Sequence, residues 1–236
     1  MLEAALWGLV GGLALVIGAV ITFIRRPSER LVAFVMAFGS GVLISAVAYD
    51  LTAGAFDLGG GDAVAVGLAA GALVYAGASR MLDRHATGPE GAGRALALGA
   101  LLDGIPESAA IGLTLVGGGG VSAAFVIAVF ISNVPESFSS TTEFERARRT
   151  RAQIIAIWTA IAVASALAAG LGYEFLGGGS ADLQAGTQAF AGGAILTMLA
   201  TEMMPTAYED SGKSIAIGLV TVLGFALAAG LSAIGG

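Results

Sequence analysis

One short motif sets two carboxylates and a proline inside an apolar stretch of the chain. Asp103 and Glu107 are four residues apart, so their side chains share one face of a helix. Pro106 stands between them and has no backbone N–H, which frees the carbonyl of Leu102 from its helical hydrogen bond. Carboxylate and carbonyl oxygens are the ligands that hard divalent cations prefer in proteins. The motif therefore indicates a cation site.

A second motif repeats this pattern further along the chain. Ser132, Asn133 and Glu136 align with the first motif at an offset of 29 residues, and Pro135 again directly precedes the glutamate. Pro135 frees the carbonyl of Ile131, so this helix also presents carbonyl and carboxylate oxygens. A proline that serves packing alone explains one such motif, but it does not explain two prolines that are each followed by glutamate.

Three further acids, Asp50, Glu143 and Glu202, lie in other apolar stretches. An ionisable group at bilayer depth costs several kcal/mol, so it is usually functional. No Lys or Arg lies within the core of any apolar stretch, and ion pairing therefore does not account for these acids. They must be protonated, hydrated in a cavity or neutralised by a bound cation, and we favour the cation. We expect Asp50, Glu143 and Glu202 to belong to its pathway, with Asp50 toward the outside and Glu202 toward the cytoplasm.

The composition of the chain predicts the elements that position these acids. Hydrophobic residues make up 56% of the 236 residues and charged residues 12%, with a mean hydropathy of +0.87. Soluble domains carry about twice this charged fraction, so a soluble enzyme and a nucleic-acid binder are excluded. The absence of cysteine and the single histidine, His85, exclude disulfides, thiolate metal sites and histidine clusters.

Eight apolar stretches are each long enough to span a membrane, which requires roughly 20 residues. We therefore predict an all-α polytopic membrane protein with a single transporter domain over residues 1–236. The predicted spans are residues 4–24, 31–56, 63–82, 95–116, 121–143, 154–175, 183–207 and 214–234.

The basic residues predict the orientation of these spans. All 11 Lys and Arg residues fall in the connections after the first, third, fifth and seventh spans or at their edges. Positive connections face the cytoplasm. We therefore expect a multi-pass protein of the cell (inner) membrane with both termini outside the cytoplasm.

Two internal repeats relate spans of opposite orientation. The first is the pair of carboxylate motifs, and the second matches residues 37–56 to residues 189–208 at an offset of 152, which aligns Asp50 with Glu202. Inverted repeats are typical of transporters that work by alternating access around a site near the membrane midplane. Asp50 and Glu202 are then the entrance and exit acids of one pathway.

With these motifs, the sequence resembles the Zrt/Irt-like protein (ZIP) family of divalent metal transporters over essentially its whole length. The doubled Pro-Glu carries the resemblance, together with the Glu-x-x-Pro that runs from Glu202 to Pro205. The resemblance implies eight spans in a 3 + 2 + 3 arrangement and a two-metal site that Glu107 and Glu136 bridge. The further ligands that it implies are Asp103 and Ser132 at one position and Asn133 at the other.

The chain departs from the family pattern in ways that bear on the metal. Asp103 and Ser132 stand where the family has histidine, and Gly104 replaces an asparagine. Loss of imidazole shifts the expected preference from zinc toward harder ions such as manganese, iron(II), magnesium or cobalt. We expect uptake of divalent metal into the cytoplasm, with the metal as substrate and no cofactor.

Two other functions remain open beside metal transport. One is a cation- or proton-coupled carrier of an organic solute, which calls for aromatic residues around the motifs. The other is an intramembrane enzyme, which calls for a nucleophile or an activating histidine that the motifs do not supply. We expect no enzyme and no nucleic-acid partner, the lipid bilayer is the expected surrounding, and a homodimer stays open.

Overall fold

The computed structural model describes residues 1–85, 88–116, 121–176 and 178–235, and every regular element in these ranges is a helix. No strand occurs among these described residues. The predicted all-α class is therefore confirmed.

In chain order, the elements of the described ranges are α1 (Leu2–Ile24), α2 (Glu29–Ala46), η1 (Val47–Ala53), α3 (Gly54–His85), α4 (Gly88–Thr114), α5 (Ala123–Arg146), α6 (Arg151–Leu171), η2 (Gly172–Leu176), α7 (Ala181–Met198), η3 (Leu199–Met203), α8 (Met204–Asp210) and α9 (Ala216–Gly235). The elements η1, η2 and η3 are π-helical turns, in which the backbone hydrogen bond reaches one residue further back than in an α-helix.

The prediction of eight separate spans needs correction. Five helical stretches in the described ranges are long and apolar enough to cross a membrane, namely Leu2–Ile24, Glu29–Leu82, Ala123–Arg146, Arg151–Glu174 and Ala216–Ala233. The second stretch contains two predicted spans, because only Gly60 interrupts its helical backbone. Gly60 has φ 71°, a conformation that glycine adopts without strain, and it kinks the run. The other two predicted spans are helical but less uniformly apolar: α4 carries Asp103 and Glu107, and the α7–η3 run carries Asp182 and Glu202.

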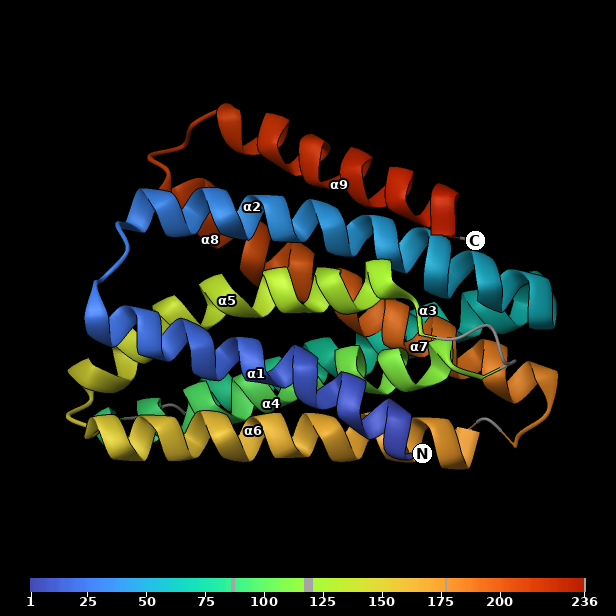
Figure 1. Cartoon of the computed structure of the whole chain (residues 1–236), viewed down its shortest axis with the longest axis horizontal. Coiled ribbons are helices and arrows are strands. Elements are labelled where there is room, and N and C mark those ends of the chain that lie inside the picture. The colour runs from blue at the N-terminus through green and yellow to red at the C-terminus, as the bar shows by residue number, and fades with distance from the viewer. Residues whose placement is uncertain (86–87, 117–120, 177, 236) are drawn as a thin grey trace.

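The helices pack into two groups (Figure 1). In one group, α1 lies against α5 and α6, and α4 lies against α6. In the other group, α3 lies along α7, and α2 lies along α9 and also contacts α8. We call these the α1/α4/α5/α6 group and the α2/α3/α7/α8/α9 group. Contacts of α2 with α5, and of α4 with α7 and α3, join the two groups.

Three connections that carry basic residues, all within the described ranges, gather at one end of the molecule. In Figure 1 the α1–α2, α5–α6 and α8–α9 connections all lie at the left, whereas both chain termini lie at the right. We call the left end the basic end. The predicted clustering of basic connections on one side therefore appears in the fold.

Glycines allow close contact between helices. A Cβ built on Gly71 of α3 would lie 1.9 Å from the carbonyl oxygen of Phe190 in α7, and one on Gly12 of α1 would lie 2.6 Å from the Cα of Ala162 in α6. No larger side chain fits at either position. Such backbone contact is how helices associate where lipid supplies no hydrophobic drive.

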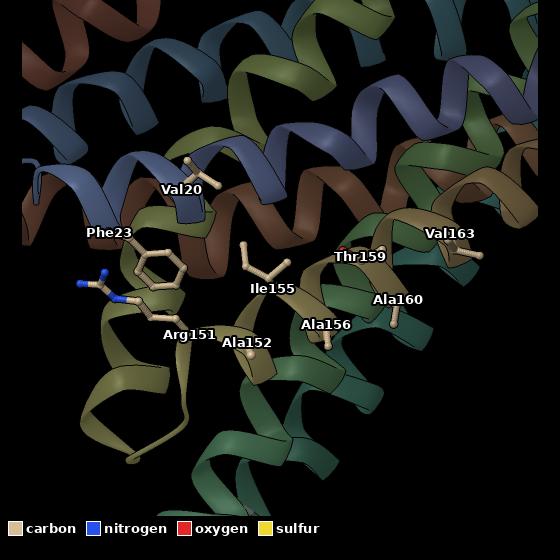
Figure 2. A pocket seen from close by; sticks show the side chains of 9 residues that line it. All are labelled: Val20, Phe23, Arg151, Ala152, Ile155, Ala156, Thr159, Ala160 and Val163. Atoms are coloured by element: carbon tan, nitrogen blue, oxygen red, sulfur yellow. The ribbon is translucent and has the colours of Figure 1, made fainter.

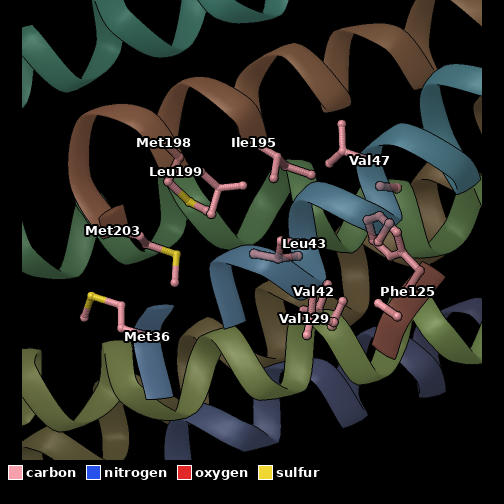
Figure 3. Packing of buried hydrophobic residues seen from close by; sticks show 14 of the residues in the cluster. Met36, Val42, Leu43, Val47, Phe125, Val129, Ile195, Met198, Leu199 and Met203 are labelled. Atoms are coloured by element: carbon pink, nitrogen blue, oxygen red, sulfur yellow. The ribbon is translucent and has the colours of Figure 1, made fainter. Parts of the chain in front are cut away.

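The main apolar core lies where the two groups meet (Figure 3). Leu43 and Val47 of the α2–η1 run face Ile195 and Leu199 of the α7–η3 run, and Phe125 comes from α5. Met198 and Met203 are buried in the same cluster and pack among its apolar side chains. The cluster includes Val47 of η1 and Met203 of η3, so it extends to the helix turns that carry Asp50 and Glu202.

Candidate functional site

The first motif lies in α4, and one of its carboxylate oxygens is buried without a hydrogen-bond partner. Glu107 is 1% exposed, and its Oε2 has no hydrogen-bond partner. Asp103, one turn earlier, is only partly buried. Burying a charged oxygen without a hydrogen bond or counter-charge costs several kcal/mol, so Glu107 requires a proton or a cation beside it.

The second motif lies in α5, where its polar residues contact the backbone. Ser132 is fully buried, and its hydroxyl donates to the carbonyl of Val129 at 2.9 Å. Asn133 is also buried, and its side-chain amide donates to the carbonyl of Gly11 in α1 at 3.0 Å. The amide N–H of Asn133 therefore serves the α1–α5 contact. The Ser132 oxygen keeps lone pairs that are free to accept or to ligate.

The acids of the two motifs lie near one another and near Glu202. The carboxyl group of Glu136 interacts electrostatically with those of Asp103, Glu107 and Glu202, and Glu107 interacts with Asp103. Among the residues that the structure describes, no basic side chain contributes to these interactions. The fold thus brings together three residues that the sequence places on α4 and α5 and a fourth from η3.

These acids are close without forming a finished coordination sphere. Within the described ranges, no group of three or more His, Asp or Glu side chains is arranged tightly enough to hold a metal ion.

A tyrosine that the sequence reasoning missed links two of the acids. Tyr75 of α3 is 2% exposed, and its hydroxyl lies 2.5 Å from Oδ1 of Asp103 and 2.8 Å from Oε1 of Glu202. Ser79, one turn later in α3, donates to the same Glu202 oxygen at 3.0 Å. A tyrosine hydroxyl has one proton, so it can donate to only one of the two carboxyl groups at a time. We call Tyr75, Ser79, Asp103 and Glu202 the inner polar cluster.

One signal in the sequence could have found this cluster. Tyr75 and Ser79 are four residues apart in an apolar stretch, so their hydroxyl groups share one helix face. A buried tyrosine usually finds a hydrogen-bond partner for its hydroxyl. Together these two facts indicate a polar contact on this face of α3.

Asp50 lies away from the basic end and has a single hydroxyl partner. Its Oδ1 accepts from the hydroxyl of Ser122 at 3.0 Å, and its Oδ2 is buried without a partner. Ser122 also caps α5, because its Oγ accepts from the backbone N–H of Phe125 at 3.1 Å. We call Asp50 and Ser122 the outer polar pair.

Asp50 and Glu202 both lie on π-helical turns. The turn η1 begins at Val47 and η3 begins at Leu199, which are related by the offset of 152 that aligns the two acids. π-helical turns are rare and often occur at functional sites. The second repeat therefore extends to the backbone conformation around its acids.

Glu143 does not belong with the other acids. It forms an ion pair with Arg146, one turn later in α5, and its side chain is 45% exposed. The expectation that all acids of the apolar stretches lack a basic partner is therefore wrong for Glu143. The reason is that the last turn of α5 extends to the basic end, where an arginine side chain reaches back.

Comparison with known proteins gives no relative. No protein-family model matches the chain, and no curated protein matches it. The function must therefore be inferred from the helices and from the site itself.

Proposed function

We propose that this protein carries divalent metal cations across a membrane through the carboxylates of α4 and α5. The observation that carries the proposal is the buried, unpartnered Oε2 of Glu107 in a group of four interacting acids without a base. A cation supplies the missing positive charge, and ionisable residues within a membrane span are usually functional because they are costly to bury there. The site ligands that we propose are Asp103, Glu107, Ser132 and Glu136. Asn133 joins them through its carbonyl oxygen.

Alternating access is the mechanism that the packing supports. If the first, second and third spans correspond to the sixth, seventh and eighth, the contact of α2 with α9 corresponds to that of α7 with α3. Likewise the contact of α1 with α5 corresponds to that of α6 with α4. All four contacts are present, and they define the two helix groups. Relative motion of these groups would expose the acids first to one side and then to the other.

The polar contacts between the groups fit this motion. The Asp50–Ser122 hydrogen bond joins η1 to the start of α5, and the Tyr75–Asp103 hydrogen bond joins α3 to α4. Each therefore crosses from one helix group to the other, toward opposite ends of the helices. We propose that the outer pair opens when metal enters and that the inner cluster opens when metal leaves toward the cytoplasm.

The ZIP-like arrangement of eight spans, with the basic end in the cytoplasm and both termini outside, is part of the proposal. Eleven basic residues in alternate connections support this orientation. The membrane potential then favours uptake by ~2.3 kcal/mol per charge per 100 mV, which doubles for a divalent ion. Oxygen ligands without imidazole favour manganese, iron(II), magnesium or cobalt over zinc.

Uptake by purified protein in liposomes tests the proposal. Influx of manganese, iron(II), cobalt, magnesium and zinc is measured for the natural chain, for Glu136→Gln and for Glu209→Gln. Glu209 is an exposed acid outside the group, paired with Lys213 at 3.5 Å, so its variant is the matched control. We expect influx of at least one metal that Glu136→Gln lowers tenfold or more and Glu209→Gln leaves unchanged. Absence of metal influx, or equal rates for both variants, would contradict the proposal.

A further inference from the structure

A groove between α1 and α6 runs along the outside of the α1/α4/α5/α6 group. It has a volume of about 870 Å³, and its walls are almost entirely apolar (Figure 2). Along α6 its floor is formed by small residues, Ala152, Ala156 and Ala160, and it extends to Val163. We call this the α1–α6 groove.

One charged side chain stands at the end of the groove nearest the basic end. Arg151 is the first residue of α6, and its guanidinium lies 5.1 Å from the ring centre of Phe23 in α1, as Figure 2 shows. A cation above an aromatic ring is held in place without being neutralised. In the part of the chain that the structure describes, Arg151 has no ion pair with an acid.

The surroundings of Arg151 reinforce its positive charge. The first turn of α6 contains no acid, so the positive end of the helix dipole is not compensated there. Arg148 and Arg149 precede the helix in the same connection. This end of the groove therefore attracts an anion, whereas the rest of the groove accepts only apolar groups.

The length of the groove corresponds to one leaflet of a bilayer. From Arg151 to Val163 the helix rises by about 18 Å at 1.5 Å per residue. The hydrocarbon of one leaflet is roughly 15 Å thick, which is half of a core of about 30 Å. A chain anchored at Arg151 thus reaches the bilayer midplane where the groove ends.

We propose that the α1–α6 groove binds one anionic phospholipid of the cytoplasmic leaflet, with its phosphate at Arg151 and an acyl chain along Ala152–Val163. This inference rests on the membrane setting and orientation of the proposed function, but it does not depend on which solute is carried. A second copy of the chain is disfavoured in the groove. Two-fold packing about an axis along the membrane normal would bring Arg151 against its own counterpart without an acid between them.

Native mass spectrometry of the purified chain tests the inference. Phosphatidylglycerol and phosphatidylcholine with the same acyl chains are added separately, and the fraction of protein that retains lipid is measured. We expect preferential retention of phosphatidylglycerol. Arg151→Gln should lower it about fivefold, the effect of one basic residue at an anionic lipid surface. Arg30→Gln is the matched control, since Arg30 also lies over an aromatic ring, that of Phe34 in α2, but stands outside the groove, and it should change retention little.

A second pair of variants tests the acyl chain. Ala156→Phe fills the groove and should reduce retention of phosphatidylglycerol, whereas Leu167→Phe places the same side chain on an exposed part of α6 beyond the groove. Inorganic phosphate in millimolar excess should not displace the lipid, because the apolar contacts remain.

Three results would overturn the inference. They are equal retention of the two lipids, equal loss with Arg151→Gln and Arg30→Gln, and full displacement by phosphate. A dimer that Ala156→Phe dissociates without changing lipid retention would assign the groove to contact between copies and would also overturn it. Since no metal enters these measurements, their failure is distinct from failure of the transport proposal.

Discussion

The outer polar pair and the inner polar cluster are built on equivalent positions of the repeat, yet they hold their acids differently. Asp50 accepts one hydrogen bond from Ser122 and keeps a buried oxygen without a partner. Glu202 contacts the hydroxyl groups of Tyr75 and Ser79, and Tyr75 also reaches Asp103 in the first motif. Glu202 is therefore connected to the proposed metal site through Tyr75, whereas Asp50 is connected only to the start of α5.

The difference teaches what the repeat preserves. Both copies of the second repeat have a π-helical turn with an acid, but the hydroxyl partner of Asp50 precedes α5 and those of Glu202 come from α3. The two ends of the proposed pathway then need not open with equal ease. Because the inner cluster has more hydrogen bonds, we expect the closed inner end to be the more stable of the two.

Removal of the charge at Glu107, between the two ends, should have the largest effect. Glu107→Gln keeps the size of the side chain and removes a carboxylate that is 1% exposed and incompletely hydrogen-bonded. We expect metal uptake to fall at least tenfold while the midpoint of thermal unfolding rises. An increase of about 1 kcal/mol in the free energy of unfolding corresponds to a rise of ~2–4 °C in a protein of this size. A midpoint that falls as uptake falls would indicate damage to the fold instead.

Tyr75→Phe should separate the two ends most clearly. It removes the hydroxyl from the inner cluster while the ring stays, and it leaves two acids with fewer partners. We expect the free energy of unfolding to fall by ~2 kcal/mol, which lowers the thermal midpoint by about 4–8 °C. The matched control is Tyr49→Phe, since Tyr49 is 52% exposed and packs against Phe225 through its ring. Equal shifts for the two variants would show that the Tyr75 hydroxyl contributes nothing.

The same variant makes a second prediction about access. The chain has no cysteine, so a single introduced thiol reports on its position alone. Met203→Cys is buried beside Glu202 in the core cluster. We expect Tyr75→Phe to speed labelling of this thiol from the cytoplasmic side, whereas Tyr49→Phe should leave the labelling rate unchanged.

Ser122→Ala tests the outer polar pair and should have a smaller effect. It removes both the cap of α5 and the hydrogen bond to Asp50. Ser180→Ala removes the corresponding cap of α7, where the serine has no acid partner. We expect the free energy of unfolding to fall by ~1 kcal/mol in Ser180→Ala and by ~2 kcal/mol in Ser122→Ala. Urea or thermal unfolding of both variants measures the difference, and equal losses would mean that the Asp50 contact adds no stability.

Glu143→Gln should have the smallest effect of all. The Glu143–Arg146 pair is exposed, and such pairs contribute about 0–1 kcal/mol. We expect unchanged metal uptake and a thermal midpoint within ~4 °C of that of the natural chain. A large loss of uptake would show that Glu143 takes part in the pathway although it is paired with Arg146.

The sequence predicts the helical class and the neighbourhood of the acids for identifiable reasons. Apolar stretches of about 20 residues have few alternatives to helix, and the doubled Pro-Glu identifies Glu107 and Glu136 without knowledge of the fold. The prediction fails at Glu143 because Arg146 lies just beyond the apolar stretch, and its long side chain reaches back to pair with this acid.

Other features depend on tertiary contacts and could not be predicted in this way. The spacing of Tyr75 and Ser79 indicates a polar contact on one face of α3, but the acids that make this contact come from α4 and η3, far away in the sequence. The π-helical turns at Asp50 and Glu202 insert one residue into a turn, which hydrophobic periodicity does not reveal. The kink at Gly60, among the 37 glycines of the chain, likewise appears only in the backbone.

Equilibrium binding of manganese to the purified protein is the most direct test of the central claim, that the acids of α4 and α5 form a divalent-cation site. Titration followed by calorimetry or by the electron paramagnetic resonance of free manganese gives both affinity and stoichiometry. We predict saturable binding to the natural chain, loss of at least one bound ion in the double variant Glu107→Gln/Glu136→Gln, and unchanged binding in Glu209→Gln. Equal binding by the natural chain and the double variant would contradict the claim.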